Sequence, residues 1–262
     1  MKWINVCLAA LTACVAYSQT SSSSFEIATV KPSDPAATGT RVAIAPGGTF
    51  QARNVTLRSM ILQAYDVLDF QLSGGPGWIN TERYDIEAKG NGPAVSKEDL
   101  SKMNDDQRNQ FEQQMFSRIR ALLEERFQLR IHREMKDRPV YALMLAKSGS
   151  KMGNAVDRDS ATPQYGLSTK TTVGGRIEMT AKEEPMGRWA HALSTQVGRT
   201  VIDKTGLKGN LNFKITFAPD LSDNEGPSIF TALEEQLGLK LEAGRGSVEV
   251  VVIDGVEHPS AN

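Results

Sequence analysis

Cysteine is almost missing from this chain of 262 residues, which has only Cys7 and Cys14. Both precede Ser18, after which we expect the N-terminus to be cleaved, so no disulfide would stabilise the mature protein. Paired metal-binding spacings are also missing, since the three histidines are scattered: His132, His191 and His258. We therefore expect no metal and no cofactor, and we expect structural roles for the histidines.

An excess of positive charge is missing as well. The chain has 30 Lys and Arg residues against 31 Asp and Glu residues. Nucleic-acid binding needs clustered basic residues that neutralise phosphates, so we expect no nucleic-acid partner. Hydrophobic residues make up 40% of the chain and charged residues 23%, which is typical of a protein with a packed core.

A long apolar run occurs only at the N-terminus and is too short to remain as a membrane span. Lys2 gives a short positive segment, residues 4–17 carry no charge, and Ala16 and Ser18 are small residues at the positions that signal peptidase reads. Residues 1–18 therefore predict a signal peptide and export to the periplasm or beyond. Leu11–Cys14 also fits a lipoprotein signal, and only lipidation at Cys14 would anchor the protein to a membrane.

The remaining sequence contains an internal repeat. Four segments of the first half match four segments of the second half in the same order: Gly47–Gln51 with Gly174–Glu178, Arg83–Glu87 with Asn212–Thr216, Leu123–Phe127 with Leu233–Leu237, and Val140–Leu145 with Val248–Ile253. We predict an α+β fold of two pseudo-symmetric lobes from an internal duplication, each a mainly antiparallel sheet with two helices on one face. The expected boundaries are residues 19–155 for the first repeat, 156–166 for a linker and 167–262 for the second repeat.

Apolar stripes and turn residues predict the elements of each repeat. Helical stripes begin at Leu57, Phe111, Met186 and Ile229, and strands alternate around Tyr84 and Phe213. Asn54 is a plausible N-cap for the first helix, while Pro185 and Gly198 fit the two ends of the third. Residues 136–138 and 244–246 are predicted as hairpin tips.

Three short motifs match those of penicillin-binding serine enzymes: Ser148–Lys151, Lys204–Gly206 and Ser222–Asn224. Their order is permuted relative to those enzymes. Ser148 also lies in a glycine-rich loop, where nothing would bury Lys151 and make it a base. We therefore predict that Ser148 is no nucleophile, and we expect no catalytic residue.

Two other features favour structural roles. Gly74–Trp78 leads into a strand, whereas a phosphate-binding loop leads into a helix, so we interpret it as a tight turn. Arg126, Arg130 and Arg133 alternate with glutamates, which favours a solvated, ion-paired face over a docking site.

Several segments resemble a soil-associated exported bacterial family of unknown function that is expanded in Acidobacteria. The resemblance covers nearly all of the mature chain and lies in the segments Phe25–Ser33, Gly74–Ile79, Arg83–Ala88, Leu122–Phe127, His132–Glu134, Pro139–Tyr141, Asp203–Gly209, Pro227–Phe230 and Glu235–Leu241. It implies no established activity. Some relatives are joined to membrane metallopeptidase sensor modules, which implies sensing or interaction outside the cytoplasm.

Two functional classes remain open from the sequence. The first is a non-catalytic binding or interaction module of the cell envelope, whose partner is an envelope protein or a cell-surface ligand. The alternative is an envelope hydrolase whose site is assembled only in the fold. An enzyme should show converging polar groups with shifted pKa values, whereas a binding module should show an open face, edge or groove.

Overall fold

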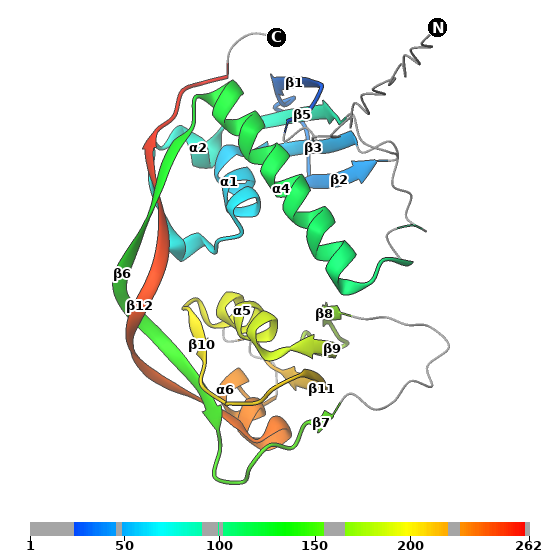
Figure 1. Ribbon diagram of the computed structural model, residues 1–262, viewed down its shortest axis with the longest axis vertical. Coiled ribbons are helices and arrows are strands. Elements are labelled where there is room, and N and C mark those ends of the chain that lie inside the picture. The colour runs from blue at the N-terminus through cyan, green and yellow to red at the C-terminus, as the bar shows by residue number, and fades with distance from the viewer. Residues whose placement is uncertain are drawn as a thin grey trace, which may run out of the picture. The chain divides into compact units, whose positions relative to one another are not determined.

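The computed structural model describes residues 24–45, 49–90, 99, 102–154, 166–219 and 226–259. The predicted signal peptide, Ser222–Asn224 and all of the predicted linker except Gly166 lie outside these residues. The described chain is mixed α+β and contains three four-stranded sheets (Figure 1). It divides into two compact units, one from residues 1–60, 80–127 and 258–262 and the other from 61–79 and 128–257.

The first unit contains an antiparallel sheet of order β1-β5-β3-β2, formed by β1 (Ile27–Pro32), β2 (Arg41–Ala45), β3 (Thr49–Thr56) and β5 (Arg83–Lys89). The predicted alternation in β5 is confirmed, because Tyr84, Ile86 and Ala88 are buried. Helix α4 (Asp105–Phe127) packs on this buried face, where the rings of Phe127 and Tyr84 meet edge to face at 5.3 Å. The opposite face of the sheet is polar.

The chain passes from one unit to the other within two shorter helices, α1 (Leu57–Tyr65) and α2 (Trp78–Thr81). The predicted stripe of α1 is confirmed, since Leu57, Met60, Ile61 and Ala64 are buried. None of the described helices is both long and apolar enough to cross a bilayer.

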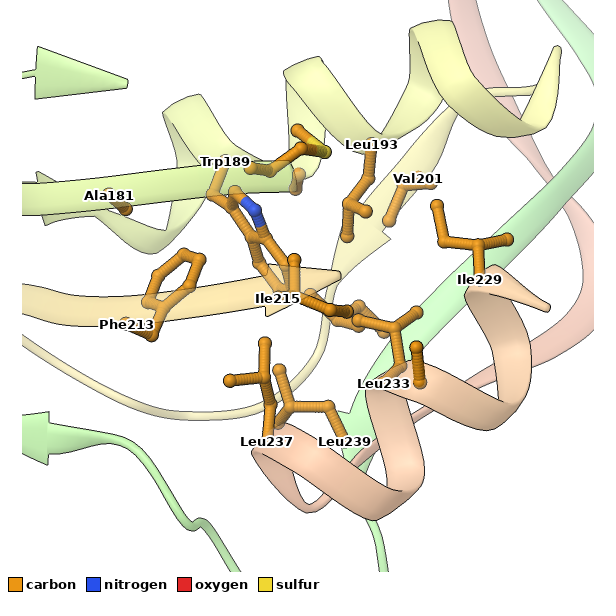
Figure 2. Packing of buried hydrophobic residues seen from close by; sticks show 14 of the residues in the cluster. Ala181, Trp189, Leu193, Val201, Phe213, Ile215, Ile229, Leu233, Leu237 and Leu239 are labelled. Carbon is orange, nitrogen blue, oxygen red and sulfur yellow. The ribbon is translucent and has the colours of Figure 1, made fainter. Parts of the chain in front are cut away.

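The second unit contains a sheet of order β7-β11-β9-β8. Its strands are antiparallel: β7 (Gly153–Asn154), β8 (Gly166–Thr171), β9 (Ile177–Pro185) and β11 (Asn210–Phe217). Its helices are α5 (Met186–Val197), α6 (Ile229–Ala232) and the π-helical turn η2 (Leu233–Leu237). Figure 2 shows Trp189 of α5 beside Phe213 and Ile215 of β11, and the rings of Trp189 and Phe213 lie 4.5 Å apart.

A third sheet, also in the second unit, is built around two long strands. Strands β6 (Arg130–Leu145) and β12 (Leu239–Gly255) run side by side as an antiparallel ribbon (Figure 1). The short 3₁₀ helix η1 (Asp69–Gln71) precedes β4 (Leu72–Gly74), which pairs in parallel with β12. Strand β10 (Val201–Asp203) pairs in parallel with β6, so the sheet order is β10-β6-β12-β4.

The predicted hairpin tips are wrong. Residues 136–138 lie inside β6 and residues 244–246 lie inside β12, where Arg138 is directly opposite Gly246. Charged and glycine residues look like turns in a local window. Here these residues lie in the middle of two long paired strands. Each strand is paired with a partner more than 100 residues away in the chain, which a local window does not contain.

The predicted N-cap of α1 is also wrong by two residues. Asn54 belongs to β3 and has a left-handed backbone with φ 54°. Its side-chain amide donates to the carbonyl oxygen of Gly39 at 2.7 Å. The cap of α1 comes from Thr56, whose Oγ1 accepts from the Ser59 backbone N–H at 3.2 Å.

Candidate functional site

A loop that follows β6 folds over the end of η2 and forms one wall of a surface hollow. The Ala146 N–H donates to the Gly238 carbonyl and the Lys151 N–H to the Leu237 carbonyl, each at 2.9 Å. Gly238 ends η2 with φ 66°, and a Cβ at this position would lie 1.8 Å from the Gly149 carbonyl oxygen. The loop therefore packs directly against the backbone of the helix end.

The other walls of the hollow are fixed in the same way. The Gln236 side chain bonds both main-chain groups of Thr216, accepting from its N–H at 3.0 Å and donating to its carbonyl at 2.8 Å. This pairing holds η2 against the outer edge of β11. Ser228 caps α6, because its Oγ accepts from the Thr231 N–H.

The space enclosed by these segments, which we call the β12 hollow, measures about 520 Å³ and is open to solvent. Its lining combines hydroxyl, charged and apolar side chains: Ser148, Lys151, Phe230, Thr231, Glu234, Glu235, Lys240 and Leu241. Its volume falls within the range that is usual for ligand sites, about 300–1,000 Å³. The hollow belongs entirely to the second unit.

The two lysines of the β12 hollow are engaged by the protein itself. Lys151 Nζ donates to the Glu235 carbonyl oxygen at 2.6 Å, so the cation sits at the negative end of the helical segment. Lys240 is ion-paired with Glu242. By contrast, the carboxylates of Glu234 and Glu235 are exposed, and neither has an ion-pair partner within the described part of the chain.

An exposed aromatic ring completes the hollow. Phe230 is 37% exposed, and its inner side packs edge to face on Tyr141 at 5.4 Å between ring centroids. The guanidinium carbon of Arg199 lies 5.3 Å from the centre of the Tyr141 ring, which is a cation–π contact. The Phe230 ring is thus supported from behind while it faces solvent.

The structure describes two of the three motifs that resemble those of serine enzymes. Ser148 and Lys151 both line the β12 hollow, but no hydrogen bond joins their side chains among the described contacts. In Lys204–Gly206, Thr205 is buried, and both its N–H and its hydroxyl donate to Asp203. These bonds form a turn and leave the hydroxyl engaged, so the segment has a structural role. Ser222–Asn224 lies outside the described residues. The prediction that Ser148 is no nucleophile stays a prediction.

None of the three histidines is among the lining residues of the hollow. His132 Nδ1 is 2.8 Å from Asp254 on an exposed part of the ribbon, His258 Nε2 is 3.1 Å from Glu82, and His191 is exposed on α5. Among the described residues, no cluster of three or more His, Cys, Asp or Glu side chains could hold a metal ion. Of the arginines predicted to lie on an ion-paired face, Arg133 pairs with Glu249, whereas Arg126 donates to the main-chain carbonyl of Ala28.

The turn at Gly74–Trp78 has a structural role. Gly74 and Gly75 have φ 82° and 80°, and a Cβ on Gly74 would lie 2.8 Å from the Ile253 carbonyl oxygen. This glycine pair therefore lets the chain pass close to β12. The turn leads into the four-residue helix α2 before β5 begins, so the prediction that it leads directly into a strand is wrong.

Two carboxyl groups with lowered pKa values, those of Asp85 and Glu178, lie on sheet strands and have cationic partners. The backbone N–H of Asn54 donates to Asp85 at 3.0 Å and lowers the pKa of that carboxyl, helped by Ser33 and Arg53. Lys170 and Lys214 reach Glu178 at 2.8 and 2.6 Å and lower its pKa in the same way. Both carboxylates are already ion-paired, so these ionisations stabilise the sheets and do not mark a cleft.

Reasoning from the sequence missed the β12 hollow. The apolar stripe of Leu233 and Leu237 indicates the buried side of this segment, but nothing in the local sequence distinguishes Glu234 and Glu235 from any solvated pair of acidic residues. The hollow depends on the loop after β6, which approaches η2 from 80 residues away in the chain. The exposed Phe230 beside two acidic residues was the one local signal.

Comparison with known proteins gives one match. Residues 58–256 match the model of a family described as "Protein of unknown function (DUF3738)". No curated protein and no solved structure shows significant similarity to the chain.

Proposed function

The chain belongs to this DUF3738 family of unknown function, and we propose that it is a non-catalytic binding or interaction module exported to the cell envelope. The observation that carries the proposal is the β12 hollow. It presents an exposed aromatic ring and two exposed carboxylates that have no ion-pair partner within the described part of the chain. Such groups are available to a partner without any rearrangement of the fold.

The shape of the hollow favours binding over catalysis. It is wide and open, whereas a catalytic site gains from excluding water around converging polar groups. The lowered pKa values of Asp85 and Glu178 occur outside the hollow, where each carboxylate already has its partners. An envelope protein or a cell-surface ligand is the partner we propose.

The alternative is an envelope hydrolase, and one observation favours it. Ser148 and Lys151 lie together in the lining of the hollow. For this chemistry Lys151 would have to accept the proton of Ser148, yet its Nζ donates to the Glu235 carbonyl at 2.6 Å.

A hydrogen-exchange experiment separates these functions. The mature protein would be incubated with a solubilised bacterial envelope extract, and deuterium uptake would be followed by mass spectrometry. We expect slower exchange in peptides that cover residues 228–241. The variant Phe230→Ala should lose this protection, while Phe70→Ala should keep it, because Phe70 is equally exposed, at 38%, but lies outside the hollow.

Two results would overturn the proposal. The first is unchanged exchange around the hollow in the presence of the extract. The second is the appearance of cleaved envelope products that vanish with Ser148→Ala, since that result would establish the hydrolase.

Export is a separate part of the proposal and has its own test. Residues 1–18 carry the signal pattern, and the mature chain would begin at Gln19. Mass spectrometry of the protein secreted by a bacterial host should give a chain that starts there. A diacylated Cys14 would select the lipoprotein alternative, and a chain that retains Met1 would contradict export.

We further infer that the fold arose by internal duplication, with repeats at residues 19–155 and 167–262. The strand orders β1-β5-β3-β2 and β7-β11-β9-β8 support this inference, with the difference that β7 (Gly153–Asn154), which takes the place of β1 in the second sheet, comes from the first repeat. So do the left-handed residues Asn54 and Glu183, which lie 129 residues apart near the ends of β3 and β9. In the third sheet, β4 of the first repeat pairs with β12 of the second, while β10 of the second pairs with β6 of the first.

A further inference from the structure

The charges that line the β12 hollow are unbalanced in favour of negative charge. Lys240 is neutralised by Glu242, which leaves Lys151 as the one remaining cation of the lining, and its ammonium is directed at main-chain carbonyls of η2. Against it stand the carboxylates of Glu234 and Glu235, adjacent in η2 and exposed. A cation that enters the hollow would be attracted by these two carboxylates and repelled by Lys151 alone, whereas an anion would meet the reverse, so the balance of charge favours a cation.

The apolar part of the lining restricts the ligand further. Phe230 and Leu241 are partly exposed in the same hollow as the two carboxylates. A short aliphatic chain can cover this apolar surface while a terminal charge stays hydrated beside the acids, as lysine side chains do on protein surfaces. An aromatic ring also attracts an ammonium group within about 6 Å.

We propose that the β12 hollow binds a primary ammonium at the end of an aliphatic chain, of the kind carried by lysine and other diamino acids in an envelope peptide. This rests on the proposed function, because it names the ligand chemistry of the same site. The carboxylate of Glu234 or of Glu235 receives the ammonium, while Phe230 and Leu241 contact the methylene groups. The hydroxyls of Thr231 and Ser148 lie in the lining and can bond the peptide backbone.

The test uses the full mature chain labelled with ¹⁵N and titrated by NMR with the tripeptide Gly-Lys-Gly, blocked at both ends. We expect saturable shift changes at Thr231, Glu234, Glu235 and Lys240. The same tripeptide acetylated on the lysine Nε should bind at least tenfold more weakly, because acetylation removes the charge and keeps most of the chain. Higher salt should weaken binding, as it does for partly exposed charge pairs.

Variants assign the effect to the hollow. The double variant Glu234→Gln/Glu235→Gln should bind the lysine peptide at least tenfold more weakly, and it should fold normally because both side chains are exposed. Glu257→Gln is the matched control, since Glu257 is an exposed carboxylate outside the hollow. It should leave the dissociation constant unchanged.

Three outcomes would overturn the inference. Equal binding of the acetylated peptide would show that the amine is not recognised. Tighter binding of a glucosamine tetramer than of the lysine peptide would assign the hollow to an amino sugar. Lack of binding by the lysine peptide, while envelope extract still protects residues 228–241 from exchange, would reject the amine and leave the proposed binding function standing.

Discussion

Gly238 shows how a single residue links the end of a helix to the candidate site. It follows the helical segment 229–237 and has a φ of 66°, the left-handed conformation in which many helices end. The structure adds a second requirement, because a Cβ would lie 1.8 Å from the Gly149 carbonyl oxygen. Only a glycine leaves room for the loop that carries Ser148 and Lys151.

We predict that Gly238→Ala lowers the free energy of unfolding by about 3 kcal/mol or more, since it combines left-handed strain with a backbone clash. Gly198→Ala is the matched control. Gly198 also ends a helix in the left-handed region, with φ 64°, but nothing lies within 4 Å of its would-be Cβ. It should cost about 1 kcal/mol. Urea unfolding at neutral pH measures both values, and equal losses would contradict the role assigned to the loop.

At the scale of elements, local patterns predicted the helices well. Helix α5 begins after Pro185 and ends at Gly198 as expected, and its predicted stripe of Met186, Trp189, Ala190 and Leu193 is buried. This success has a simple physical cause. Helical periodicity and caps depend on residues within one or two turns, so one short window contains all the information.

The long ribbon of β6 and β12 could not be predicted in this way. A strand acquires its register from its partner, and here the partner of Arg138 is Gly246, which no local window contains. The same limit applies to the β12 hollow. Its lining comes from the loop after β6, from α6 with η2, and from the start of β12. Sequence periodicity indicated which side of η2 is buried, but not that its polar side faces another segment.

At the scale of the whole molecule, each unit contains a sheet in which a carboxylate on one strand forms ion pairs with cationic residues of the neighbouring strands. Asp85 occupies this position in the first unit and Glu178 in the second, and both have lowered pKa values. A carboxyl whose pKa is lower in the folded than in the unfolded state stabilises the fold at pH values above its unfolded pKa. This contribution is lost as the pH falls through the folded pKa.

We therefore predict that the double variant Asp85→Asn/Glu178→Gln is less stable than the wild type at pH 7, and that the difference shrinks as the pH falls. The ordinary pKa values of the two carboxyls are 3.8 and 4.5, so the difference should remain full above about pH 5. It should narrow below that pH as the wild-type carboxylates take up protons and lose their attraction to Arg53, Lys170 and Lys214. Urea unfolding midpoints between pH 7 and pH 3 measure the effect, with Glu257→Gln as a control that should follow the wild type throughout. A stability difference that is constant with pH would mean that the two side chains contribute through their shape and neutral hydrogen bonds rather than through their charge.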